Sequence, residues 1–443
     1  MRTVVVLFTR DLRVHDHPAL AAAAANAERV VPLFVLDPTL LGRSPNRDRF
    51  LHQCLADLRD ALRARGADLL VRRGDPVAET IAVATGVGAE GVAVTGDVSR
   101  YARRRETRLR AECDQHRLSL RIFPGLSVVE PGVLRPGGGG HYKVFSPYHR
   151  AWEATKWRDE VATPRRLTLP DGVASGDLPD PPPGESPRAA AGGEQVARRA
   201  LRDWLDHLDG YAERHNDLPA DGTSRLSPYL RFGCLSPLVV AHLARERAGA
   251  GPAAFLRQLS WRDFYYQVAL AFPQLSTNAY RTAGETRWRY DTDALHAWQD
   301  GDTGVPVVDA GMRQLHQEGW MHNRARLITA SFLTKHLGLD WRDGVRWFSR
   351  WLLDGDVANN SGNWQWVAGT GNDTRPYRRF NPIRQAQRFD PDGAYVRRYV
   401  PELAELPGPE IHQPWRLPAQ LRQRLPYPAP MESHRDEAVW LRG

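Results

Sequence analysis

The first 123 residues alternate short apolar runs with segments of helical periodicity, and this alternation strongly constrains the fold. The apolar runs predict strands at 4–8, 30–36, 68–71, 91–94 and 120–123. Helical periodicity between them predicts helices at 17–25, 47–65, 76–84 and 100–115. Strands and helices that alternate in this way form a parallel sheet with right-handed crossovers. We therefore predict an α/β fold with a five-stranded, doubly wound parallel sheet.

The first turn of this predicted sheet lacks the glycines of a dinucleotide site. No G-x-G-x-x-G sequence follows the first strand, and residues 9–13 read Thr-Arg-Asp-Leu-Arg instead. The glycine pattern lets the backbone approach a pyrophosphate closely. The sequence therefore argues against a standard dinucleotide site at this position.

The pattern changes after the predicted sheet. Residues 131–195 contain a glycine run at 137–140 and a proline-rich stretch at 179–184, which are typical of a linker, with local order expected around 142–148. Helical periodicity then dominates, as at 263–270, 308–315 and 324–336. A chain of 443 residues is also long for one core. We predict an α/β domain at 1–130, a linker at 131–195 and an all-helical domain at 196–443.

Charge and cysteine content narrow the classes of function. Lys and Arg outnumber Asp and Glu by 60 to 52, for a net charge of +8. This excess, nearly all arginine, suits phosphate contacts and a nucleic-acid partner, but a GC-rich genome produces the same bias. The three cysteines, Cys54, Cys113 and Cys234, have no spacing for zinc or an iron–sulfur cluster, so we expect buried thiols and no metal. No membrane span or signal peptide is evident, so a cytoplasmic protein is expected.

Residues 347–366 have an unusual composition, reading WFSRWLLDGDVANNSGNWQW. Two acids flank a glycine at 354–356, and three asparagines and four tryptophans accompany them. Because Asn, Asp and Gly favour caps and turns, we predict a helix that ends, a loop, and a second helix with polar groups directed at a ligand. A surface loop before an amphipathic helix is the alternative. A calcium loop is disfavoured, since Ala358 and Asn359 occupy positions that need a ligand and a glycine.

Three shorter motifs each have a functional and a structural interpretation. Residues 222–228, GTSRLSP, suit a phosphate or a simple helix cap. Residues 260–266, SWRDFYY, suit base stacking or a buried aromatic seam with an Arg–Asp ion pair. In GWMHNRAR at 319–326, Asn323 and Arg326 fall one turn apart on one helix face, whereas His322 suits a structural role.

Together, in order and spacing, these segments resemble the DNA photolyase/cryptochrome family. The resemblance runs from FTRDLRVHD at 8–16 to FNP at 380–382, with its longest blocks at 303–315, 319–333 and 353–366. The family implies an N-terminal α/β domain and a helical C-terminal domain that holds flavin adenine dinucleotide (FAD) in a bent shape. The implied FAD-binding residues are Tyr211, Thr223, Ser224, Arg225, Leu226, Ser227, Phe255, Arg262, Trp320, Arg326, Asp354, Gly355, Asp356 and Asn360.

The resemblance assigns specific roles to some of these positions. Arg326 and Asp354 are expected to pair beside the flavin ring. Asn360 is expected to face flavin N5, where an amide can donate or accept a hydrogen bond. The implied electron relay from flavin to protein surface consists of Trp364, Trp341 and Trp298, which with Asn360 are the expected catalytic residues.

The resemblance also implies a mouth that binds UV-damaged DNA. Trp261 and Trp366 match aromatic residues that flank a flipped-out pyrimidine dimer, which has to leave the base stack to reach a buried flavin. The other residues implied there are His215, Gln258, Asn323, Arg324 and Leu327. Three of these positions, Gln258, Leu327 and His215, depart from the glutamate, methionine and arginine common in cyclobutane-dimer photolyases.

The function implied by the resemblance is blue-light-driven repair of cyclobutane pyrimidine dimers by an electron from reduced FAD. The alternatives are a cryptochrome-type light sensor without repair activity and (6-4) photoproduct repair, although neither residue 323 nor residue 327 is the histidine that (6-4) repair uses. Arg47 and Asp97 resemble ligands of an antenna chromophore, 8-hydroxy-5-deazaflavin, with methenyltetrahydrofolate as second choice. A helix-start arginine and a strand-end cap are the structural alternative. A monomer is expected.

Overall fold

The computed structural model describes residues 1–281, 288–372, 375 and 378–431. Contacts group the chain into two compact units that interleave along the sequence. Unit 1 comprises Met1–Gly184, Ala190–Asp209 and Ser224–Gln274. Unit 2 comprises Glu185–Ala189, Gly210–Thr223 and Leu275–Gly443. This grouping differs from a linear division into sheet domain, linker and helical domain, because several helices beyond residue 190 belong to the unit that contains the sheet.

Unit 1 contains the five-stranded parallel sheet that the sequence predicts. Its strands are β1 (Thr3–Phe8), β2 (Arg29–Leu36), β3 (Leu70–Arg73), β4 (Gly91–Thr95) and β5 (Ser119–Phe123). They lie in the order β3-β2-β1-β4-β5, and every neighbouring pair is parallel. All residues of the central β1 are buried, as expected of a strand covered on both faces.

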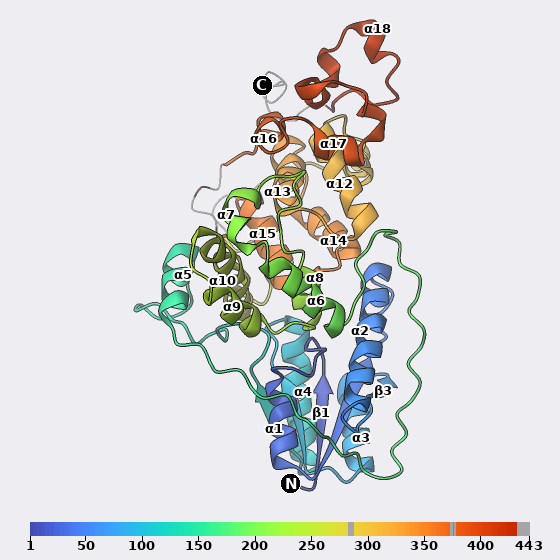
Figure 1. The fold of residues 1–443 in the computed structure, drawn as a ribbon, viewed down its shortest axis with the longest axis vertical. Coiled ribbons are helices and arrows are strands. Elements are labelled where there is room, and N and C mark those ends of the chain that lie inside the picture. The colour runs from blue at the N-terminus through green and yellow to red at the C-terminus, as the bar shows by residue number, and fades with distance from the viewer. Residues whose placement is uncertain (282–287, 373–374, 376–377, 432–443) are drawn as a thin grey trace. The chain divides into compact units, whose positions relative to one another are not determined.

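Four helices connect these strands and flank the sheet in Figure 1. They are α1 (Pro18–Asn26), α2 (Pro45–Arg63), α3 (Pro76–Gly86) and α4 (Arg100–Gln115). Each begins after a residue whose side chain accepts a backbone N–H of the first turn: His17, Ser44, Asp75 and Ser99. Side chains of α3 and α4 pack with those of four strands in one apolar cluster. These local signals explain why the predicted bounds lie within a few residues of the observed ones.

The remaining regular elements of unit 1 are helices. Its helices are α5 (Phe145–Ala154), α6 (Glu194–Leu205), α8 (Ser227–Phe232), α9 (Pro237–Arg245) and α10 (Ala250–Ala271), with a 3₁₀ turn, η1 (Leu208–Gly210), where unit 1 meets unit 2 along the chain. Helix α5 begins within the stretch 142–148, which confirms the local order expected there. The three cysteines are buried free thiols, as predicted.

A buried polar junction connects the turn after β1 to later segments of unit 1. The Arg13 side chain is fully buried. Its Nε donates to the His15 carbonyl at 3.2 Å, and its two Nη atoms donate to three further backbone carbonyls. These belong to Asp16 at 3.1 Å, Gly125 at 3.0 Å and Gly233 at 3.0 Å. A buried guanidinium is tolerated only when its donors are satisfied, so the surrounding loops have to be held in this arrangement.

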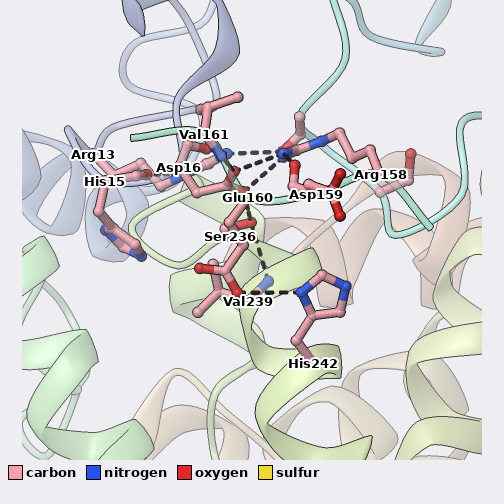
Figure 2. Close-up of polar contacts among 12 residues, drawn as sticks. Arg13, His15, Asp16, Arg158, Asp159, Glu160, Val161, Ser236, Val239 and His242 are labelled. Atoms are coloured by element: carbon pink, nitrogen blue, oxygen red, sulfur yellow. Dashed lines mark hydrogen bonds and ion pairs between the residues drawn. The ribbon is translucent and has the colours of Figure 1, made fainter. Parts of the chain in front are cut away.

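Asp16 forms the second half of this junction, as Figure 2 shows. Its carboxylate accepts from both Nη atoms of Arg158 at 2.6 Å, from the Val161 N–H at 3.0 Å and from the Ser236 hydroxyl. Burial raises the pKa of Asp16, but these hydrogen bonds outweigh it and lower the pKa below the ordinary aspartate range. The first motif of the family resemblance therefore has a structural role in unit 1.

Unit 2 is helical in the part that the structure describes, apart from an isolated bridge between Arg289 and Leu339. Its α-helices are α7 (Tyr211–Arg214), α11 (Thr292–Asp300), α12 (Pro306–Glu318), α13 (Asn323–Ser331), α14 (Trp341–Trp351), α15 (Val357–Ala368), α16 (Pro382–Phe389), α17 (Ala394–Tyr399) and α18 (Ala419–Arg422). A π-helical turn, η2 (Phe332–His336), extends α13, and 3₁₀ turns follow at η3 (Pro401–Leu403), η4 (Gly408–His412) and η5 (Pro414–Arg416). No helix within the described ranges is long and apolar enough to cross a bilayer.

Candidate functional site

The acidic loop predicted from the sequence lies between α14 and α15 in unit 2. Helix α14 ends at Trp351 and α15 begins at Val357, which confirms the predicted helix, loop and second helix. Asp356 is the N-cap of α15: its carboxylate accepts from the Asn359 N–H at 2.9 Å and from the Asn359 Nδ2 at 3.0 Å. The neighbouring Gly355 donates its N–H to the Leu352 carbonyl at 3.2 Å. Both residues therefore shape the loop through local bonds.

Asp354, at the start of the same loop, forms the predicted ion pair with Arg326 of α13. The Asp354 side chain is only 5% exposed, and its two oxygens accept from Arg326 Nη1 at 3.1 Å and Nη2 at 2.8 Å. Arg326 Nε also donates to the Met321 carbonyl at 2.7 Å. A bidentate pair of this kind fixes the planes of both groups. The indole of Trp320 is buried nearby, with the Arg326 guanidinium 6.0 Å from its ring centroid.

Asn360 lies half-buried on α15, and its amide bonds to α14. Its Nδ2 donates to the Val345 carbonyl at 3.2 Å and to the Ser349 Oγ at 3.0 Å. These two partners come from successive turns of α14, so the position of this amide depends on the packing of α14 against α15.

Trp364 is buried against α14 and α11. Its ring lies edge-on to Phe348 at a centroid distance of 4.9 Å and to Trp298 at 6.0 Å. A Cβ added to Gly344 would lie 2.1 Å from the nearest Trp364 ring carbon, so glycine is needed for this close approach. The Trp341 indole is fully buried and carries the Arg342 guanidinium 4.7 Å from its ring centroid.

Trp298 does not match the role predicted for it, the surface end of the tryptophan relay. Its side chain is fully buried, and its Nε1 donates to the Thr329 carbonyl at 3.0 Å. An indole without solvent exposure cannot be where the relay reaches the surface. Trp288, which sequence reasoning missed, is only partly buried and packs against the same core. The signal was present in the sequence, since arginines precede and follow Trp288, whereas Trp298 lies on the apolar face of a helix.

The phosphate-binding stretch predicted at 223–227 is divided between the two units. In unit 2, the Thr223 Oγ1 is buried without a hydrogen-bond partner among the described residues. A buried orphan hydroxyl calls for an explanation, and it fits a site for a phosphate oxygen of FAD. A Cβ on Gly222 would lie 2.7 Å from the Arg214 Cβ, so this turn is tight. Tyr211 of α7 is buried, and burial raises the pKa of its phenol.

The remaining predicted FAD residues belong to unit 1. Arg225 has a backbone φ of +50°, and Ser224 Oγ accepts the Leu226 N–H at 3.4 Å, so the turn before α8 is fixed locally. Ser227 is the first residue of α8. Leu226 and Phe255 are buried core side chains, with Phe255 5.6 Å from the ring of Trp204. Their burial favours a structural role in the core of unit 1.

Arg262 forms hydrogen bonds with two backbone carbonyls within unit 1. Its Nη1 donates to the Leu126 carbonyl at 2.6 Å and its Nη2 to the Leu230 carbonyl at 3.2 Å. Asp263 lies 3.8 Å away and is buried, and burial raises its pKa to about 6 although Arg262 lowers it. The structural interpretation of SWRDFYY, a buried seam with an internal ion pair, therefore holds for Arg262 and Asp263.

Trp261, the predicted lesion-stacking residue of unit 1, is only half-buried. One neighbour is Phe145 at the start of α5, whose ring is stacked on it at a centroid distance of 3.6 Å and an interplanar angle of 6°. Tyr265 is stacked less closely, at 5.7 Å and 28°. The Arg257 guanidinium lies 4.7 Å from the Phe145 ring centroid, and the neighbouring Gln258 is exposed. The predicted linker thus contributes the residue that holds Trp261 in place.

The predicted lesion-binding residues of unit 2 differ in exposure: one is exposed, and the others pack against or bond to neighbouring side chains. Asn323 is exposed at the first position of α13, while Leu327 and Trp366 pack partly against the unit core. Arg324 donates to Asn216 Oδ1 at 2.6 Å, and its guanidinium lies 4.4 Å from the centroid of the Phe389 ring.

His215 has mainly a local role in unit 2. His215 follows the last residue of α7; its Nδ1 lies 2.9 Å from the carbonyl of Tyr211, the first residue of that helix, and its ring packs 4.9 Å from that of Tyr211. Arg378 is a residue that the sequence did not predict for the site. Its guanidinium lies 5.1 Å from the centroid of the Trp366 ring.

The predicted antenna residues of unit 1 have local partners. The Asp97 carboxylate accepts from Arg10 Nη1 at 3.1 Å and from the Ser99 N–H at 2.8 Å. Arg47 lies in the first turn of α2, where its backbone N–H donates to the Ser44 Oγ at 3.4 Å. These bonds are those of a strand-end cap and a helix-start residue, and an antenna role for this pair stays a prediction.

Comparison with known proteins identifies the family models and relatives that this chain resembles. The family model of DNA photolyase matches residues 4–166, and that of the FAD binding domain of DNA photolyase matches residues 255–440. The deoxyribodipyrimidine photo-lyase of Streptomyces griseus is 50% identical over 97% of this chain and 96% of its own length. The one from Escherichia coli is 37% identical over 99% and 97%.

Solved structures agree with the sequence relatives. A bacterial class III photolyase from Agrobacterium tumefaciens superposes with a TM-score of 0.93 at 35% identity, over 98% of this chain and 95% of that one. A cryptochrome from Synechocystis sp. PCC6803 superposes with a TM-score of 0.91 at 31% identity, over 98% and 97%. By sequence, fold and domain matches, this chain belongs to the DNA photolyase/cryptochrome family.

Proposed function

We propose that this chain is a light-driven deoxyribodipyrimidine photo-lyase that uses FAD to split cyclobutane pyrimidine dimers in DNA. The observation that carries the proposal is the arrangement of unit 2, in which Arg326 of α13 pairs with Asp354 of the loop before α15, and Asn360 and the buried Trp364 follow on α15. The 50% identity to the Streptomyces griseus deoxyribodipyrimidine photo-lyase supports it.

The proposed work of the protein is positioning and electrostatics. When bound, FAD supplies the light-driven electron that opens the dimer ring. Arg326 and Asp354 orient the flavin ring, and the Thr223 hydroxyl binds a phosphate oxygen. The FAD binding domain match over residues 255–440 supports this cofactor. Because the electron would return to the cofactor after the ring opens, the repaired DNA undergoes no net redox change, and fixed geometry around the flavin contributes more than acid–base chemistry.

The proposed lesion-stacking residues are Trp261 in unit 1 and Trp366 in unit 2, each with a half-buried ring. Asn323, exposed at the start of α13, hydrogen-bonds the lesion. Gln258 donates an amide N–H to a thymine carbonyl without needing a protonated acid. The net charge of +8 favours contact with DNA phosphates, so binding is expected to weaken with salt.

A direct assay tests this function. The reduced, FAD-loaded protein is mixed with UV-irradiated oligo(dT) and exposed to blue light, with a dark sample and a defined (6-4) oligonucleotide as controls. Recovery of thymine absorbance in the illuminated sample alone is the expected result. Illumination without recovery would overturn the dimer-repair proposal, and recovery only on the (6-4) substrate would reassign the lesion.

A second candidate function is a cryptochrome-type light sensor. The TM-score of 0.91 to the Synechocystis cryptochrome favours it, since repair and signalling share this fold. The same assay separates the two, because a sensor would undergo flavin photoreduction without loss of dimers. We further propose a cytoplasmic monomer with a deazaflavin antenna. The absorption spectrum of the purified protein tests the antenna.

The electron relay yields a prediction about three tryptophans. Trp364→Phe and Trp288→Phe should each slow photoreduction of oxidised flavin at least tenfold, because phenylalanine is much harder to oxidise, yet leave repair by pre-reduced enzyme intact. Trp298→Phe should instead mainly lower stability, by about 1–3 kcal/mol, because the buried Thr329 carbonyl loses its donor. Photoreduction kinetics and thermal unfolding measure both effects. Slow photoreduction in Trp298→Phe with normal rates in Trp288→Phe would contradict this assignment.

The stacking of Phe145 on Trp261 yields a second prediction. Phe145→Ala should free the Trp261 indole to rotate and weaken binding of dimer-containing DNA about fivefold to tenfold, a loss of ~1–1.5 kcal/mol typical of an aromatic pair. Phe145→Tyr, which keeps the ring, should bind like the parent. The measurement is the difference in affinity between damaged and undamaged duplexes. If Phe145→Ala and the parent bind the lesion with equal affinity, Phe145 does not contribute to lesion binding.

A further inference from the structure

Arg257 of α10 lies on the same helix face as Trp261, the lesion-stacking residue proposed for unit 1. The two residues are four positions apart, so their side chains are neighbours, about 6 Å apart along the helix axis. Arg257 and the next residue, Gln258, are both exposed. A dimer that stacks on Trp261 would therefore have the backbone of its own strand close to Arg257.

An aromatic ring restrains the guanidinium of Arg257. Its Cζ lies over the ring of Phe145, 4.7 Å from the ring centroid, which is a cation–π contact. Phe145 is buried, and its ring is stacked on Trp261 at 3.6 Å and on His149 at 5.4 Å. Because the ring is held by its own neighbours, the guanidinium is partly ordered before a partner binds, which lowers the entropy cost of binding.

The hydrogen-bond donors of Arg257 have no acceptor in the part of the chain that the structure describes. The guanidinium makes neither a hydrogen bond nor an ion pair there. Arg262 of the same helix differs, since it donates to two backbone carbonyls. A guanidinium has five N–H donors, and a phosphate group can accept two of them at once.

We propose that Arg257 binds a DNA phosphate beside the flipped dimer, and that Phe145 holds the guanidinium for this contact. The inference rests on the proposed function and deepens it, because it assigns a backbone contact to the strand that carries the lesion. Phe145 then supports two contacts with that strand, one through the Trp261 indole and one through the Arg257 cation. Stacking on the dimer and binding of the phosphate are thereby connected through one ring.

The experiment measures binding of the FAD-loaded protein to a duplex that carries one cyclobutane thymine dimer, in the dark so that no dimer is repaired. Arg257→Gln should weaken binding about threefold to tenfold, the effect of one hydrogen-bonded contact. It should also reduce the slope of log K against log salt by about 0.9, the effect of one phosphate contact. Arg257→Lys keeps the charge, so it should keep the parent slope and bind more tightly than Arg257→Gln. On an undamaged duplex, which has no flipped dimer, the loss in Arg257→Gln should be smaller.

Two further comparisons test the location of the contact and the role of Phe145. Arg110→Gln is the matched control, because it removes one exposed arginine from α4 of the same unit, and it should keep the affinity and the slope of the parent. The second comparison is a double-mutant cycle with Phe145→Leu, which removes the aromatic ring. In that background Arg257→Gln should cost about twofold to fivefold less affinity than in the parent, the range of an exposed cation–π contact.

The possible outcomes separate the role of Arg257 from the function on which it rests. An unchanged slope in Arg257→Gln, an equal change in Arg110→Gln, or equal losses on the damaged and undamaged duplexes overturns the phosphate contact beside the dimer. Additive effects of the Arg257 and Phe145 substitutions overturn the role of Phe145. A parent protein that binds the damaged duplex no more tightly than the undamaged one overturns the proposed function itself.

Discussion

Gly344→Ala is expected to destabilise the protein by about 3 kcal/mol and to slow flavin photoreduction severely. In most helices this substitution stabilises by up to ~1 kcal/mol, because alanine restricts the unfolded backbone. Here the new methyl group would lie 2.1–2.5 Å from three ring carbons of Trp364. The indole is buried and rigid, so α14 or the ring has to move, and overpacking of this kind costs ~1–3 kcal/mol or more. The steric effect therefore outweighs the helix propensity.

Two measurements test this expectation. Chemical unfolding gives the stability change, and the rate of flavin photoreduction reports the displacement of Trp364. Gly86→Ala, at the end of α3, is the control, since a Cβ there meets nothing within 4 Å and should be neutral or slightly stabilising. A Gly344→Ala protein as stable as the parent would mean that α14 and Trp364 do not pack as closely as described.

Arg326→Ala should lower stability by about 3–5 kcal/mol and abolish retention of FAD. The substitution leaves the Asp354 carboxylate, 5% exposed, without its bidentate partner, and a buried charge that loses its counter-ion is costly. Arg346→Ala is the matched control, because Arg346 is 70% exposed in its pair with Asp343 and such surface pairs contribute about 0–1 kcal/mol.

A double substitution separates stability from cofactor binding. Arg326→Met combined with Asp354→Leu replaces the ion pair by apolar side chains and should recover most of the lost stability. It should not recover FAD, because the charges that orient the flavin are gone. Unfolding curves and the flavin absorbance after gel filtration measure the two properties. Retention of FAD by the double variant would show that the pair serves only the fold.

The elements that the sequence predicts well are those determined by local chemistry. Apolar runs and side-chain caps such as Ser44 and Asp75 specify the sheet and its helices, and the Asp-Gly-Asp sequence specifies the break between α14 and α15. The Arg326–Asp354 pair was predictable only through the family resemblance, since the two residues are 28 positions apart.

What the sequence does not reveal depends on packing between distant segments. The stacking of Phe145 on Trp261 brings together a predicted linker and a helix more than a hundred residues later. The bond from Asn360 to Ser349 requires α14 and α15 to be packed first. Trp298 and Trp288 differ in exposure because one lies on the buried face of α11 and the other precedes that helix.

The Arg13 junction has a consequence for how the polypeptide acquires its structure during synthesis. The carbonyls that accept hydrogen bonds from its guanidinium belong to residues 15, 16, 125 and 233, so the last of them leaves the ribosome long after β1 does. Until then a cation that is fully buried in the finished protein has to stay hydrated. The turn after β1 is therefore expected to reach its final arrangement only when about half of the chain has been translated, although all strands of the sheet are available earlier.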